Sequence, residues 1–412
     1  MNSTKRALAI GLGAALLQAL MLIAFAWPAA NIAPRDLPLA VAGPQAGAVE
    51  TRLHQTAPGA FEITTVADEA AARAAIADRE VYGAIVTGAG APRMLVASGA
   101  SPAVAQQLAA MAQTLSGVPP AAVEDVVAAD SDDPRGTAFG AMVLPLVMSG
   151  IAAGVLLSLV IPTAAARGAG LLSFGVAGGL LSTAIIQGWM SVVPGPYLLL
   201  SAVAGLVSAA VAGAVVGLAA VVGRAGIGIA ALTMLLVGNP FSAATSAPEL
   251  LPQPWGAIGQ YLPPGAAASL LRSVAFFDGT GAAKPLAVLG VWVAVAAVLL
   301  IVGVLRERAA GQDRAAVLTG TGTGQDWASA PACAESDRTS VPTGAESDGA
   351  PTLTGAESDG ARILTGAESD GTPILTSAES DRTAVPMDAR SNRKSASAGD
   401  TPTGLRSVRA TR

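Results

Sequence analysis

The chain has 412 residues, of which 52% are hydrophobic and 13% charged, and its formal net charge is -5. This composition, with a mean hydropathy of +0.55, describes a membrane protein better than a soluble one. Because His54 is the single histidine and Cys333 the single cysteine, a histidine-based catalytic triad, a multi-histidine metal site and an intrachain disulfide are excluded. We therefore expect no enzyme, no bound metal and no nucleic-acid partner.

Six long apolar stretches contain no Asp, Glu, Lys or Arg. They cover residues 7–27, 137–161, 169–193, 197–222, 225–245 and 285–305. Since a helix rises 1.5 Å per residue, about 20 apolar residues cross a hydrocarbon core of about 30 Å. The pattern predicts a polytopic α-helical membrane protein with six transmembrane helices. The first stretch is longer than a signal-peptide core, which has about 7–15 residues, so we interpret 1–27 as an uncleaved anchor helix.

The basic residues that flank these stretches fall on one face of the membrane. They are Lys5, Arg6, Arg167, Arg224, Arg306 and Arg308. By the positive-inside rule this face is cytoplasmic, so both termini lie inside a plasma (inner) membrane and residues 28–136 lie outside. Arg272 and Lys284 fall on the outer face and are outnumbered.

Residues 28–136 alternate between strand and helix patterns. Strands are predicted at 37–42, 61–66, 81–86 and 93–96, and helices at 48–56, 69–78 and 103–115. Asp68 and Ser101 stand at helix starts as caps. This order favours an extracytoplasmic α/β domain between the first and second helices, without a catalytic cluster. The carboxylates that follow either bind a cation or, more simply, belong to a polar linker before the second span: Glu124, Asp125, Asp130, Asp132 and Asp133.

Several segments carry a family resemblance. The stretches "DLPLAVAG", "ADEAAARAAIADREVYGAIV" and "RMLVASGASPAVAQQL" resemble the outer domain of type-2 ABC-transporter permeases and of the related phage-infection-protein (Pip) membrane proteins. The likeness continues over 238–279, with Asn239-Pro240, Leu262-Pro263-Pro264 and Arg272 in the expected order, and covers about residues 1–310. It implies the membrane subunit of an exporter, working as a homodimer or heterodimer and driven by a separate ATPase subunit. The alternative is a Pip-like envelope receptor or scaffold that transports nothing.

The connection over 246–284, within a transmembrane domain that extends from 137 to 308, has its own chemistry. Pro240 breaks the fifth helix and frees a carbonyl that protein or water must satisfy. Trp255 and Tyr261 are placed as interfacial anchors, and 266–277 as a short helix at the outer surface. The connection is either a capping loop or a re-entrant element at the mouth of a path. Candidate path or outer-gate residues are Gln187, Asn239, Pro240, Pro263, Pro264 and Arg272.

The energy source is constrained by two absences in the sequence. The spans hold no ionisable residue between their ends, which disfavours ion-coupled transport. The sequence contains no phosphate-binding loop of the form G-x-x-x-x-G-K-[ST], and the pattern of Thr319 to Gly324 is typical of a linker. We therefore expect this chain to bind no cofactor and the partner subunit to bind ATP. Gln187 either lines a translocation path or forms a hydrogen bond with a neighbouring helix. The many Gly and Ala residues of the second to fourth spans indicate close helix packing, and only secondarily a dimer face.

Residues 309–412 form a tail of different composition. Ala-Glu-Ser-Asp recurs from Glu335 to Glu379 at a spacing of eleven, within repeats at about 334–386. Because Gly, Pro and Thr fill the repeats, ordering entropy outweighs burial and we predict disorder. The basic end either touches anionic lipid of the inner leaflet or stays in solution.

Overall fold

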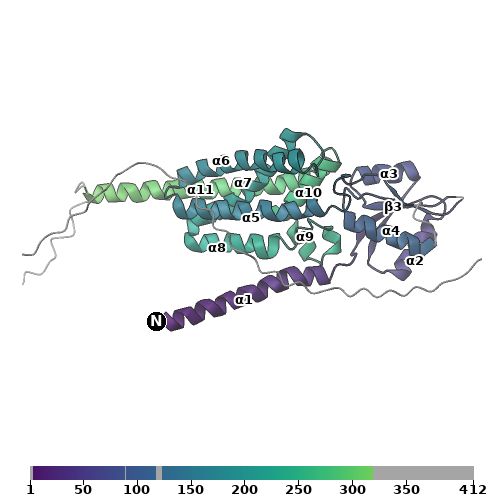
Figure 1. The fold of residues 1–412 in the computed structure, drawn as a ribbon, viewed down its shortest axis with the longest axis horizontal. Helices are drawn as coiled ribbons and strands as arrows, with labels where there is room; N and C mark the ends of the chain where they lie inside the picture. Colours follow the sequence, from purple (N-terminus) through teal and green to yellow (C-terminus); the bar gives the residue numbers. More distant parts are fainter. Residues whose placement is uncertain (1–2, 89, 117–122, 319–412) are drawn as a thin grey trace, which may run out of the picture. The chain divides into compact units, whose positions relative to one another are not determined.

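The computed structural model describes residues 3–88, 90–116 and 123–318 (Figure 1). The repeats at 334–386, the basic end, Cys333 and the 319–324 linker lie outside the described residues, and so do the predictions made for them. The predicted disorder from residue 309 is wrong for its first ten positions, because the last helix continues through them to Leu318.

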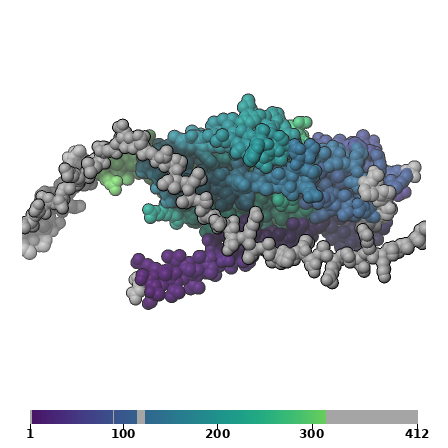
Figure 2. Space-filling view, viewed as in Figure 1, coloured from purple at the N-terminus to yellow at the C-terminus, as the bar shows by residue number. Residues whose placement is uncertain are grey.

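Five helices are long and apolar enough to cross a membrane. They are α1 (Ser3–Ala30), α5 (Thr137–Val160), α6 (Ala164–Thr183) with its π-helical continuation η2 (Ala184–Trp189), α7 (Tyr197–Val222) and α11 (Ala283–Leu318). They coincide with five of the six predicted spans, and this confirms a multi-pass membrane protein by length and hydropathy. Helix α1 carries most of its side chains at the surface, as its purple atoms in Figure 2 show.

The predicted fifth span is shorter than expected. It consists of nine residues of α8 (Arg224–Leu232) and six of the π-helix η3 (Thr233–Gly238), which together reach roughly 22 Å. The prediction of a helix to residue 245 is wrong, because Pro240 has no N–H to extend the ladder and restricts Asn239 before it. Six spans are therefore not confirmed.

Helix α7 forms the centre of the helical region, with 61% of its most apolar window buried against 22% for α5, α6 and α11. It packs against all three of these helices and against α8. Glycines make this possible: a Cβ on Gly154 would lie 2.7 Å from Val215, and one on Gly179 2.3 Å from the Ser201 carbonyl oxygen. The predicted close packing through small residues is thus confirmed inside one chain.

The α/β region contains a five-stranded sheet of order β2-β1-β3-β4-β5. Its elements are β1 (Leu37–Ala42), α2 (Ala46–Thr56), β2 (Phe61–Val66), α3 (Glu69–Ala77), β3 (Gly83–Val86), β4 (Arg93–Val96), α4 (Pro102–Ser116) and β5 (Val123–Asp125). Only β3 and β4 pair antiparallel, and Leu39 pairs with Ile63 in the parallel β1–β2 ladder. The four predicted strands and three helices are confirmed with ends shifted by up to two residues, and so are both caps.

Strand β5 was not predicted, and Glu124 and Asp125 belong to it rather than to a linker. The strand has three residues, two of them acidic, so no apolar alternation marks it. Nearby, Asp133 accepts a hydrogen bond from the Phe139 backbone N–H at 2.8 Å and so caps the first turn of α5. These carboxylates have structural roles in the sheet and at the start of a helix.

Strand β1 is buried on both faces, which explains its continuous apolar run. Leu37, Leu39 and Val41 face α2 and α4, whereas Ala40 and Ala42 face α3. The connection after η3 contributes to the same two cores, since Leu250 belongs to the first and Phe277 to the second.

That connection contains η4 (Pro248–Leu250), α9 (Trp255–Gly259) and α10 (Pro263–Phe276). Helix α10 is almost wholly buried and packs against α5, α7 and α11. The predicted short helix is confirmed, with its start at Pro263 instead of 266, and it is buried within the protein; its position at the outer surface of the membrane stays a prediction.

Candidate functional site

A polar cavity of about 570 Å³ lies where the α/β region meets α9, α10 and the start of α11. Its volume falls within the range of small-molecule sites. Seven charged residues line it: Arg35, Asp36, Glu62, Arg79, Glu249, Arg272 and Lys284. Four of these are basic, and they come from segments far apart in the chain.

Arg272 is the most deeply buried of the four, with 5% of its surface exposed. Its guanidinium donates to the carbonyls of Ala243 at 3.1 Å and Ala244 at 2.5 Å and lies over the Phe139 ring, 5.2 Å from the centroid. Burial lowers the pKa of Arg272 to about 10, so the group stays charged at neutral pH. The residue therefore satisfies two carbonyls in the chain that follows Pro240.

Arg79 joins the α/β region to α10. It follows α3 in the left-handed region, with φ of 59°. One of its nitrogens, Nη1, donates to the Ser269 carbonyl at 3.2 Å and to the Ser273 hydroxyl, and its guanidinium lies 5.0 Å from the centre of the Phe277 ring. Burial lowers the pKa of Arg79.

The remaining basic groups also rest on neutral partners. Arg35 donates to the carbonyls of Asn31, Ala33 and Leu250 at 2.8–3.0 Å. The Lys284 ammonium lies 5.2 Å from the centre of the Tyr261 ring. Among the described residues, no cationic group of the cavity lies within 4.0 Å of a carboxylate.

Three acidic residues also line the cavity, and the charge of Glu249 acts on Arg79 although the two form no ion pair. Glu249 accepts a hydrogen bond from the Tyr82 hydroxyl at 2.9 Å. Burial, followed by the nearby Glu249, raises the pKa of Tyr82, so the phenol remains a neutral donor. Asp36 and Glu62 are exposed, and water screens their charge.

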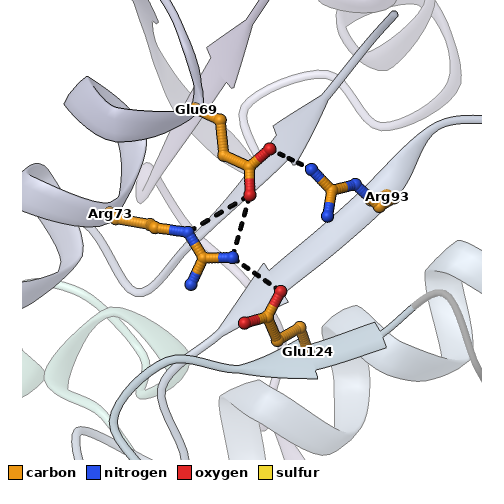
Figure 3. Close-up of polar contacts among 4 residues, drawn as sticks. All are labelled: Glu69, Arg73, Arg93 and Glu124. Carbon is orange, nitrogen blue, oxygen red and sulfur yellow. Dashed lines mark hydrogen bonds and ion pairs between the residues drawn. The ribbon is translucent and has the colours of Figure 1, made fainter.

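Arginines elsewhere in the α/β region are paired in the ordinary way. Figure 3 shows Arg73 between Glu69 at 2.8 Å and Glu124 at 2.6 Å, and Arg93 bonded to the other oxygen of Glu69. Hydrogen bonds to Glu124 and Glu69 raise the pKa of Arg73, and the same bond from Arg73 lowers the pKa of Glu124. This cluster ties α3 to β4 and β5, which is a structural role.

The structure brings together only part of the predicted site. Arg272 and Tyr261 line the cavity, and Pro263 and Pro264 begin the buried helix that carries Arg272. Asn239 and Pro240 end η3 outside the cavity; the Asn239 carbonyl accepts a hydrogen bond from the Ser242 hydroxyl at 2.7 Å.

Gln187 does not contribute to the cavity. It lies in η2 and donates to the carbonyls of Val193 at 3.4 Å and Gly195 at 2.6 Å, so it fastens the loop that follows its own helix. The anchor positions have exposed rings, 40% for Trp255 and 59% for Tyr261. Trp255 also stacks on Phe241 with centroids 5.4 Å apart.

Sequence reasoning missed Arg35, Arg79, Tyr82 and Glu249. One signal was present: Arg272 and Lys284 are the two basic residues of the predicted outer connection over 246–284, and both line the cavity.

A second hollow, apolar and about 690 Å³ in volume, lies between α6, α7 and α11. Leu172, Val176 and Leu198 are among its side chains. The described residues contain no group of three or more His, Cys, Asp and Glu placed to hold a metal ion.

Comparisons of the chain with protein-family models, with curated proteins and with solved structures find no match.

Proposed function

We propose that this chain is the membrane-spanning permease subunit of an ABC-type exporter, driven by a separate ATPase. The observation that carries the proposal is the distribution of charge: the apolar stretches hold no Asp, Glu, Lys or Arg, whereas seven charged residues line the outer cavity. Helices without ionisable residues offer no ion-coupling site. A nucleotide-binding partner supplies the energy, because the sequence holds no phosphate-binding loop.

In this proposal α8 and η3 form a sixth, short crossing. Gly226 packs against Leu218 at the C-terminal end of α7, and Gly238 packs against Pro264 at the start of α10. The N-terminal end of α7 also reaches α10, through Gly195. The segment therefore extends from one end of α7 to the level of the other, which supports a sixth crossing and both termini on one side; the flanking basic residues favour the cytoplasm as that side.

The apolar hollow between α6, α7 and α11 supports a dimer. Its lining consists of aliphatic side chains and small residues such as Gly175 and Gly205. Because Gly175 and Gly205 already pack against each other within the chain, the aliphatic side chains supply the surface for a second chain. We propose that a second permease chain, identical or related, contacts this face.

The cytoplasmic docking surface for the ATPase is the end of α11. This helix has 36 residues and extends beyond Leu305, with exposed Arg308, Asp313 and Arg314. Glu307 accepts hydrogen bonds from the Ala164 backbone N–H at 3.0 and 3.1 Å and so fixes α11 to the start of α6. Movement at the end of α11 is therefore transmitted to α6.

Co-purification tests the proposal. An ATPase subunit is expected to be isolated with the chain from its native membrane and to hydrolyse ATP faster in its presence. The triple variant Arg308→Ala, Asp313→Ala, Arg314→Ala is expected to lose this partner, whereas Arg135→Ala, on the opposite side of the proposed topology, keeps it.

The Pip-like receptor or scaffold is the second candidate, because the chain between α5 and α6 comprises only residues 161–163 and that between α7 and α8 only Gly223. Such short connections leave little surface for an ATPase. Absence of any ATPase from the purified chain, with an intact fold, would support this candidate and refute the exporter.

A further inference from the structure

We propose that the outer cavity binds a phosphate group, carried by a phosphate ester in solution or by an anionic lipid headgroup. The inference goes beyond export and does not depend on an ATPase partner. It rests on the charge balance of the cavity, the unused donors of its arginines and the position of its opening.

The basic residues that line the cavity outnumber its acidic residues by four to three. Arg272 and Arg79 are withdrawn from water, and neither has a carboxylate partner among the described residues. Burying a cation without an anion is strongly unfavourable. The same domain pairs Arg73 and Arg93 with carboxylates at its surface (Figure 3). The cavity differs from this surface cluster in bringing together four basic groups without an ion pair, and an anionic ligand would supply a partner for them.

The neutral partners orient the guanidinium groups but do not use all of their N–H donors. A guanidinium has five N–H groups in a planar fork. In the described part of the chain, Arg79 donates through Nη1 only, which leaves its Nη2 and Nε free for a ligand. A planar fork with two free nitrogens matches an oxyanion in bidentate geometry.

The number of donors favours a phosphate over a single carboxylate. Arg35, Arg79, Arg272 and Lys284 approach the cavity from four different segments, and a phosphate presents three or four oxygens to them. The volume of about 570 Å³ leaves room for the rest of a small ester or headgroup. The hydrogen bond from Tyr82 does not neutralise Glu249, and the proposal relies on the excess of basic over acidic residues in the lining.

The opening lies where the apolar part of α11 begins. Lys284 and Pro285 line the cavity at the first turn of this helix, and the exposed Tyr261 ring lies beside Lys284. Aromatic and basic side chains at the end of a transmembrane helix sit at headgroup level. A lipid headgroup and a soluble ester can both reach the arginines from there.

Binding by the purified full-length chain tests the proposal. The soluble arm measures sn-glycerol 3-phosphate in zwitterionic phosphatidylcholine nanodiscs, with succinate as the carboxylate comparison. The lipid arm measures thermal stabilisation in nanodiscs containing phosphatidylglycerol against phosphatidylcholine alone. We expect saturable binding in one arm, weakened as ionic strength rises. The arm that responds identifies the source of the phosphate.

Matched variants locate the site. Arg79→Gln removes a charged donor and is expected to weaken binding about 10-fold or more, and Arg79→Lys restores part of the loss. Arg93→Gln, which removes an arginine of the surface cluster, is expected to leave affinity unchanged. If Arg79→Gln fails to fold, Arg35→Gln and the exposed Lys284→Gln replace it, each with a reduced affinity expected.

Three results would overturn the inference: no saturable binding in either arm, succinate bound as tightly as the phosphate ester, or an equal loss in Arg93→Gln and the cavity variants. Failure of the ATPase experiment leaves this result untouched, so the two proposals fail separately.

Discussion

The contact between α6 and α7 predicts opposite behaviour for two adjacent glycines. A Cβ on Gly179 would lie 2.3 Å from the Ser201 carbonyl oxygen and 2.8 Å from the Gly205 backbone nitrogen. On Gly178 the nearest neighbours, in Phe174 and Ser208, are 3.7 Å away, which is ordinary contact. Gly179→Ala must therefore push two backbones apart by about 1 Å, whereas Gly178→Ala requires no shift.

The magnitudes follow from the same geometry. Both substitutions gain up to about 1 kcal/mol of helix propensity, while overpacking at Gly179 costs about 1–3 kcal/mol. Gly178→Ala is expected to be neutral or stabilising. The Gly179→Ala variant is expected to be less stable than the Gly178→Ala variant by about 1–3 kcal/mol. In a region of this size that is roughly 2–12 °C in the melting temperature.

Thermal unfolding of the two purified variants in one detergent provides the measurement, with the wild type as reference. Because both are Gly→Ala changes at neighbouring positions of α6, differences in propensity cancel. Equal melting temperatures for the two variants would show that α6 and α7 are not in backbone contact at Gly179, and the central position of α7 would have to be abandoned.

Three further predictions concern a buried hydroxyl, an acidic titration and the topology. Thr183→Val is expected to stabilise the protein by about 1 kcal/mol, because Thr183 Oγ1 is buried with no hydrogen-bond partner among the described residues. The control is Thr233→Val, which loses the 2.8 Å hydrogen bond to the Ile229 carbonyl and should show no such gain in the same melting assay. The hydrogen bond from Arg73 lowers the pKa of Glu124 below its ordinary value of 4.5. The contribution of this ion pair to stability is therefore complete above about pH 4.5 and is lost as pH falls through the lowered pKa. Between pH 6 and pH 3 the melting temperature should fall less in Glu124→Gln than in the wild type, and identical slopes would refute the coupling. In a Gln55→Cys, Cys333→Ser double variant, the new cysteine on the exposed side of α2 should react with a membrane-impermeant maleimide in intact cells. In the wild type, Cys333 should react only after permeabilisation. The reverse pattern would invert the topology.

Local patterns in the sequence predicted most of the fold. The charge-free runs identified five long helices, and the run 37–42 identified a strand buried on both faces, since each depends on side chains near one another in sequence. The early end of the fifth apolar helix is also predictable from the sequence, because Pro240 breaks a helix and lies before the end of the apolar stretch at 245. Strand β5 was not readable, since three residues with two carboxylates make sense only beside β4.

The cavity could not be predicted because its lining comes from segments far apart in the chain. Arg35 bonds a carbonyl 215 positions away and Arg79 a carbonyl 190 positions away. Such pairings depend on the fold of the whole described region. What the sequence did contain was the anomaly of Arg272 and Lys284 on the side where positive charge is least expected, which becomes intelligible once both residues line one site.

Helix α10 connects this site to the membrane region. Its buried face packs against α5, α7 and α11, and its other face offers Ser269 and Ser273 to Arg79. A ligand held by Arg79 and Arg272 would touch the α/β region through the first and α10 through the second. Any shift of the α/β region that the ligand favours is then passed to α10, and from there to the central helix α7, because close-packed interiors transmit displacement rather than absorb it. An outer site placed on this joint is coupled to the helices by packing alone, without any charge inside the membrane.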